Sequence, residues 1–97
     1  TLSLHDALPI FNLKKWGKIK IKQGLEQKKI SEYCIKKGMK EIGDEDYQKT
    51  LNELLEKKWR ILKEPNLYIK KQKAVRYLLQ KGYEPNLVWE TVNNFAD

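Results

Sequence analysis

Residues 16–42, WGKIKIKQGLEQKKISEYCIKKGMKEI, decide the fold because their pattern returns once, 53 residues further along the chain. Five positions are identical in the two copies: Lys18 and Lys71, Lys20 and Lys73, Leu25 and Leu78, Gln27 and Gln80, Lys28 and Lys81. The apolar positions keep the same register, with pairs Ile21 and Ala74, Ile30 and Tyr83, Ile35 and Val88, Met39 and Val92, Ile42 and Phe95. A repeat whose apolar positions stay in phase predicts a tandem array of stacked units, and such arrays usually act as binding surfaces.

The apolar residues follow the helical period, and no stretch alternates for long enough to predict a convincing strand. We therefore predict an all-α fold of five helices, at about residues 13–27, 32–41, 45–63, 67–80 and 85–94. The positions expected to face inward are Ile21, Leu25, Ile35, Met39, Ile42, Tyr47, Leu51, Leu54, Leu55, Leu62, Ala74, Leu78, Val88, Val92 and Phe95.

Residues with helix-capping chemistry mark several of the expected ends. Ser31 is a reasonable N-cap for the second helix. Gly43 is expected to stop that helix, and Asp44 to cap the third. Pro65 and Asn66 break the chain before the fourth helix, which Gly82 ends.

The charge is unevenly distributed along the chain, whose formal net charge is +7. Residues 14–40 carry ten Lys against two Glu, and residues 57–81 carry nine Lys or Arg against one Glu. Between them, residues 44–56 hold five acidic residues against one Lys. Two basic blocks around an acidic one predict a cationic face for an anionic partner, such as nucleic acid or an acidic protein groove. The commoner interpretation of lysine runs is a solvated surface.

The sequence contains no motif for catalysis or metal binding. It lacks a glycine-rich phosphate loop, an HExxH motif and paired cysteines, so we expect no enzyme activity, no metal, no cofactor and no small-molecule substrate. The single Cys34 fits a reducing compartment such as the cytoplasm, and we expect its side chain to be small, buried and unreactive. No run approaches the roughly 18 apolar residues of a membrane span.

The first ten residues, TLSLHDALPI, match neither the helical period nor the repeat. They resemble a translated sequencing-adapter fragment joined to a truncated reading frame, and we leave their His5 and Asp6 out of any functional site. The sequence then divides into a non-native or disordered leader at 1–11, a three-helix repeat unit at 12–64 and a second, incomplete unit at 65–97.

Several segments together resemble the later part of the RecX family, bacterial regulators of the RecA recombinase. They are KWGKIKI at 15–21, KKIS at 28–31, DEDY at 44–47 with its leucine-rich helix, Lys73, Leu78 and KGY at 81–83. The resemblance runs from about Asn12 to Phe95. It implies tandem three-helix units, here about one and two-thirds, in an elongated and curved molecule. The family's usual first unit is absent, which is consistent with truncation.

The resemblance also implies a protein that lies in the groove of the RecA filament on single-stranded DNA and alters its growth, ATP turnover and strand exchange. The sequence adds two cationic helices in equivalent positions. We expect their basic residues to contact the acidic filament surface or DNA phosphates, single- or double-stranded. These residues are Lys14, Lys15, Lys18, Lys20, Lys22, Lys70, Lys71, Lys73 and Arg76.

Two alternatives remain open. Paired short helices after a basic stretch could form an autonomous helix-turn-helix module that enters a DNA major groove. The start of such a recognition helix should expose base-reading side chains, and Glu32, Tyr33 and Cys34 read bases poorly. The other alternative is that the truncated product folds poorly and has no activity.

Overall fold

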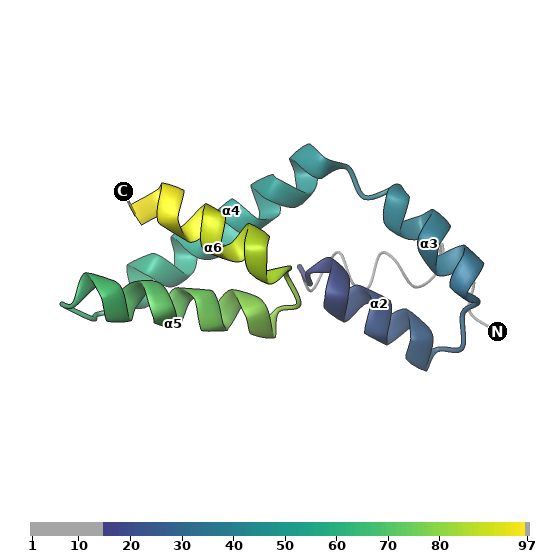
Figure 1. The fold of residues 1–97 in the computed structure, drawn as a ribbon, viewed down its shortest axis with the longest axis horizontal. Helices are drawn as coiled ribbons and strands as arrows, with labels where there is room; N and C mark the ends of the chain where they lie inside the picture. The colour runs from purple at the N-terminus through teal and green to yellow at the C-terminus, as the bar shows by residue number, and fades with distance from the viewer. Residues whose placement is uncertain (1–14, 97) are drawn as a thin grey trace.

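A computed structural model describes residues 15–96, which form five α-helices and no strand (Figure 1). The helices are α2 (Lys18–Gln27), α3 (Glu32–Lys40), α4 (Asp44–Ile61), α5 (Leu67–Gln80) and α6 (Pro85–Ala96). The body is elongated, with extents of 49 × 21 × 19 Å. The predicted all-α class is confirmed. The expected leader at 1–11 and Lys14 lie outside the described residues.

The helices bury two hydrophobic clusters. A small cluster of Ile21, Leu25 and Ile35 joins α2 to α3. A larger one joins α4, α5 and α6 and contains Tyr47, Leu51, Leu54, Leu55, Ala74, Val75, Leu78, Tyr83, Val88 and Val92. Ile42, in the connection from α3 to α4, packs against both clusters. The packing thus groups α4 with α5 and α6. The predicted boundary at residue 64 instead groups α4 with the two helices before it, because it was placed one 53-residue repeat after residue 12.

The turns that follow α2 and α5 repeat each other in backbone geometry. Both have a residue with positive φ just past the helix, Lys29 at 60° and Gly82 at 95°. Both close with an amide that donates to the carbonyl five residues earlier: Ile30 to Leu25 at 3.2 Å, and Tyr83 to Leu78 at 3.3 Å. This is the Schellman arrangement, in which a left-handed residue reverses the chain. The 53-residue register therefore holds for the backbone as well as for the apolar positions.

Two of the predicted caps form. The Ser31 hydroxyl accepts from the amide of Cys34 at 3.3 Å, and the Asn66 side chain accepts from the amide of Ile69 at 3.1 Å. The predicted cap at Asp44 is wrong, because Gly43 is the N-cap of α4 and Asp44 its first helical residue. Three acidic residues in that first turn still suit the positive end of the helix dipole.

The predicted start of α2 at about residue 13 is also wrong over the residues that the structure describes. Residues 15–17 are not helical, and Lys15 has a positive φ of 55°. Gly17, expected inside the helix, is its extended N-cap. The physical reason is tertiary, since Gly17 lies against the turn after α5 and hydrogen-bonds to it.

Most of the predicted inward positions are buried: Ile21, Leu25, Ile35, Tyr47, Leu51, Leu54, Leu55, Ala74, Leu78, Val88 and Val92. Met39, Ile42 and Leu62 are half-buried. Two predictions are wrong. Cys34 is exposed, because it lies one residue, about 100° around the helix, from the position that meets α2. Phe95 is 45% exposed in the last turn of α6, where its ring meets the edge of Trp59 with centroids 5.7 Å apart.

Candidate partner interface

The first turn of α2 is docked on the other helical unit, and this joint sets how the basic helices lie. The first amides of a helix have no partner within the helix and need acceptors elsewhere. Here the Gly17 amide donates to the Lys81 carbonyl at 2.7 Å, and the Ile19 amide donates to the Gly82 carbonyl at 3.0 Å. The Lys18 amide donates to the Tyr47 hydroxyl at 2.9 Å. We call these contacts, with the two Tyr47 and Tyr83 rings beside them, the Gly17–Gly82 joint.

Two buried tyrosines support the joint. The Tyr47 hydroxyl donates a hydrogen bond to the Glu84 carboxylate, and the Tyr83 hydroxyl donates one to the Lys15 carbonyl at 3.0 Å. The two ring centroids are 5.1 Å apart. Burial, followed by the bond to Glu84, raises the pKa of Tyr47 far above its ordinary value. Burial raises the pKa of Tyr83 to about 12, with the Glu84 charge adding to it. Tyrosine hydroxyls are protonated at neutral pH in any case, and the raised pKa values keep these two as donors at alkaline pH as well.

A cavity of about 410 Å³ opens beside the joint. Trp16, Ile42, Tyr47 and Tyr83 give it an apolar wall, and Lys15 and Asp46 also line it. Over residues 15–96, no buried side-chain nitrogen or oxygen lacks a hydrogen-bond partner, and no three His, Cys, Asp or Glu residues gather as metal ligands. The expected absence of a metal, a cofactor and enzyme activity stays a prediction.

The predicted basic residues of α2 do not share one face. Successive residues of a helix are about 100° apart, so the side chain of Lys20 leaves α2 about 200° away from that of Lys18. Lys18 lies over the Tyr47 ring, 4.7 Å from its centroid, and 3.9 Å from the Asp44 carboxylate. Lys20 lies over the Trp16 ring at 4.6 Å. Both distances from a lysine nitrogen to a ring centroid are within the range of cation–π attraction.

Lys15 and Lys22 differ in exposure. Lys15 is half-buried at the joint, where its carbonyl is an acceptor. Lys22 is exposed, and none of the described residues forms an ion pair with it. Among the predicted residues near α2 that the structure describes, Lys22 is thus the exposed one.

The basic residues of α5 are similarly divided. Lys70 lies over the Trp59 ring at 4.4 Å, and Lys71 is half-buried. Lys73 is 3.1 Å from the Glu64 carboxylate, and this hydrogen bond, with one from the Asn66 amide, holds the pKa of Glu64 below its ordinary value. Arg76 is exposed, with no ion pair inside the described region.

Helices α5 and α2 follow one another along the long axis, with the start of α2 meeting the end of α5 and α2 inclined to α5 (Figure 1). The structure thus places the two basic helices end to end. Among the predicted residues that it describes, Lys22 and Arg76 are exposed and have no ion pair within residues 15–96. Sequence reasoning missed Gly17, Tyr47 and Glu84 as parts of the joint. The sequence did predict a helix end at Gly82, which the 53-residue register aligns with Lys29. No local sequence pattern links Tyr47 to Glu84. None of the helices α2 to α6 is both long and apolar enough to span a membrane.

Two family models match the chain. One, described as the third three-helix domain of RecX, matches residues 44–92, and another, the second three-helix domain of RecX, matches residues 11–39. The gap between the matches falls between α3 and α4, where the two hydrophobic clusters also divide.

Two curated relatives, each named "Regulatory protein RecX", come from Clostridium perfringens. The protein of strain 13 / Type A is 40% identical over 74 residues, which cover 74% of this chain and 35% of the relative. The protein of strain SM101 / Type A is 41% identical over 73 residues, covering 73% of this chain and 34% of the relative. The chain spans about a third of the length of these relatives. No solved structure matches it. The two domain matches and these identities show that the chain belongs to the RecX family.

Proposed function

We propose that this chain is part of a regulator of the RecA recombinase that binds the RecA filament on single-stranded DNA. Membership of the RecX family supports this proposal, as do the relatives named as regulatory proteins. The regulator acts by binding and has no catalytic site of its own. It works in the cytoplasm, where it changes the growth and ATP turnover of the filament.

The observation that carries the proposal is the Gly17–Gly82 joint. It connects two helical units into an elongated body with a longest extent of 49 Å. A body that is ordered before it binds loses less conformational freedom on binding than two units on a flexible linker. A filament groove with a regular array of acidic sites would therefore meet basic side chains whose spacing is already set.

Among the nine basic residues predicted to bind, Lys22 and Arg76 are the first candidates for direct contact. Both are exposed and have no ion pair within residues 15–96. Lys18, Lys20 and Lys70 would have to leave aromatic rings to reach a partner, and Lys73 would have to leave Glu64. We propose that Lys18, Lys20, Lys70 and Lys73 mainly stabilise the folded protein. Lys14, Lys15 and Lys71 would make weaker contacts with the filament.

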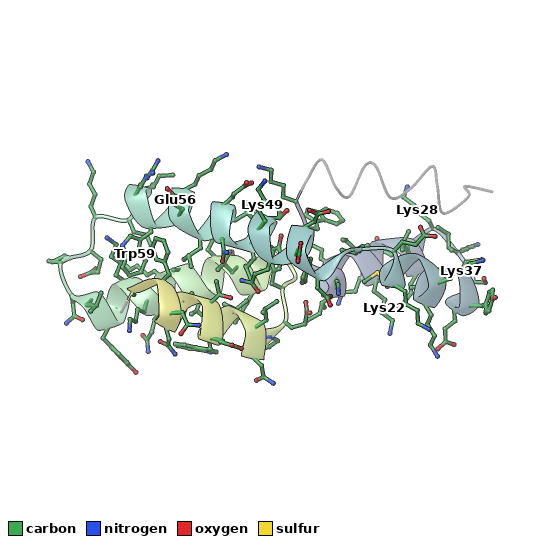
Figure 2. All side chains as sticks on the ribbon, turned by 90° about the horizontal axis from the view of Figure 1, so that it is seen from above. Lys22, Lys28, Lys37, Lys49, Glu56 and Trp59 are labelled. Carbon is green, nitrogen blue, oxygen red and sulfur yellow. The ribbon has the colours of Figure 1, made fainter. Side chains whose placement is uncertain are left out.

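Co-sedimentation with RecA filaments assembled on single-stranded DNA tests the proposal. The binding variant is Lys22→Glu with Arg76→Glu. The matched control is Lys49→Glu with Lys57→Glu, two exposed lysines of α4. Lys22 and Lys49 lie on opposite edges of the body in Figure 2. Both double variants lower the net charge equally, so a general charge effect would weaken both alike.

We expect the wild-type chain to sediment with the filament and to lower its ATP turnover. The Lys22 and Arg76 variant should bind at least about tenfold more weakly than the control, which corresponds to about 1.4 kcal/mol. Equal binding by the two double variants would remove these residues from the interface. No binding by the wild-type chain, at low salt and with circular dichroism showing a folded protein, would contradict the proposed function of this part.

A further inference from the structure

A stripe of one aromatic and three basic residues runs along the outer face of α3. Tyr33 is 74% exposed, the most exposed large hydrophobic side chain among residues 15–96. Lysines follow it at three, four and seven residues along the same helix. Residues at these spacings share one face of a helix. We call Tyr33, Lys36, Lys37 and Lys40 the α3 stripe.

The stripe faces away from the hydrophobic contacts of its own unit. The buried residues of α3 are Ile35 and Gly38, on the side that packs against α2. Figure 2 places Lys37 at the opposite end of the body from Trp59. Within residues 15–96, no ring or cation contact accounts for the position of the Tyr33 ring, in contrast to Trp59, which contacts Phe95 and Lys70.

Much of the positive charge on the stripe is uncompensated. Lys36 lies 3.6 Å from Glu32, an exposed pair that contributes little. Lys37 and Lys40 have no ion pair within the described part of the chain. The helix dipole favours lysines in a last turn. It gives no reason for an aromatic ring in solvent one turn before them.

The second copy of the repeat provides an internal comparison. In the 53-residue register, the stripe positions correspond to Asn86, Trp89, Glu90 and Asn93 of α6. That face has no basic residue and one acidic residue. The same helical scaffold therefore folds without lysines at these positions, so the basic charge of the α3 stripe is a property of this unit and no requirement of the fold.

We propose that the α3 stripe is a binding site for single-stranded nucleic acid. Tyr33 stacks on an unpaired base, while Lys37 and Lys40 neutralise neighbouring phosphates. Exposed aromatic rings beside basic residues bind single strands in this way, since every base has a face that can stack. An acidic protein surface would satisfy the lysines but would gain nothing specific from the ring. The site needs only this chain, so its test is independent of RecA.

Fluorescence anisotropy of a labelled oligothymidylate, titrated with the full chain at low salt, tests the stacking contact. Tyr33→Ala should weaken binding roughly 5- to 150-fold, and Tyr33→Phe should retain it. The matched control is Tyr68→Ala. Tyr68 is the second residue of α5, as Tyr33 is of α3, and it is 68% exposed. It lacks lysines at four and seven residues beyond it, so its loss should leave the affinity unchanged.

Salt dependence tests the phosphate contacts. The slope of log K against log salt should fall in magnitude by about 1.4 for Lys37→Gln with Lys40→Gln, and should be unchanged for Tyr33→Ala. Equal affinities for the Tyr33→Ala and Tyr68→Ala variants would overturn the proposal. So would equally tight binding of polyglutamate, which would assign the stripe to an acidic protein partner, or no binding by the folded wild-type chain.

Discussion

A Cβ atom added at Gly17 would lie 2.2 Å from the carbonyl carbon of Gly82. Likewise, a Cβ atom added at Gly82 would lie 2.3 Å from the Cβ of Lys20. Two backbone segments from different units thus meet at a distance that only glycine permits. At the corresponding positions of the other copy, the chain has Lys70 and Lys29. A joint with this geometry can therefore form at only one place among the described residues.

Gly82→Ala should destabilise the protein through both backbone strain and overlap. Gly82 has a φ of 95°, and a left-handed residue with a side chain costs roughly 1–2 kcal/mol, with overpacking adding roughly 1–3. We expect a loss of about 2–4 kcal/mol in urea unfolding. The control is Gly43→Ala, where the new Cβ would meet only the Asp46 carboxylate at 3.9 Å and the cost should stay below about 1 kcal/mol. Equal losses at the two positions would contradict the tight contact.

Lys29→Gly should stabilise the protein. Lys29 has the left-handed conformation that Gly82 has in the second copy, and it has this conformation with a side chain. Relief of this strain should raise the free energy of unfolding by about 1 kcal/mol. Lys28→Gly, at a φ of −84°, should instead lower it by up to about 1 kcal/mol. Thermal melts of both variants check the sign, and a destabilised Lys29→Gly would show that the turn differs from the one described.

Tyr47→Phe should weaken the joint. The change leaves the Lys18 amide without its acceptor and the Glu84 carboxylate without its donor. Loss of a partner for part-buried polar groups costs about 1–3 kcal/mol. Tyr83→Phe removes only the bond to the Lys15 carbonyl and should cost less. Chemical denaturation gives both values, and a loss of only a few tenths of a kcal/mol for Tyr47→Phe would show that its hydroxyl does not bridge the units.

Stability should fall steeply at alkaline pH. The folded protein keeps the Tyr83 proton up to a pKa of about 12, whereas the unfolded chain loses it near 10. The contribution of Tyr83 is therefore complete below pH 10 and is lost as the pH rises to about 12. In the Tyr83→Phe variant, the free energy of unfolding should therefore fall less steeply with pH, by at most about 1.4 kcal/mol per pH unit. Urea unfolding at pH 9 and pH 11 measures it, with exposed Tyr68→Phe as the control, and identical slopes for all three proteins would contradict the buried hydroxyl.

The sequence was sufficient to predict the helices and most of the buried positions, because these depend on local periodicity. Helix α5 begins and ends where expected, and Ile21, Leu25 and Ile35 are buried as the repeat predicted. The start of α2 could not be predicted, since it is set by a contact with Gly82, far away in the sequence.

The candidate site was harder to predict for the same reason. Whether a lysine is free depends on which aromatic ring lies beside it, and Tyr47 and Trp59 reach Lys18 and Lys70 only through the tertiary fold. Tyr33 shows the converse. The sequence shows lysines at helical spacing from Tyr33. The exposure of the Tyr33 ring, however, follows from the tertiary packing, in which α3 contacts mainly α2.

Amide hydrogen exchange at the start of α2 tests the end-to-end docking of the two units most directly. First-turn amides of a helix normally exchange fast because they have no partner within the helix. The Gly17, Lys18 and Ile19 amides should instead be protected nearly as well as the core of α5, whereas the Glu32 and Tyr33 amides at the start of α3 should exchange freely. Equally fast exchange at both helix starts would show that the units are not joined as described.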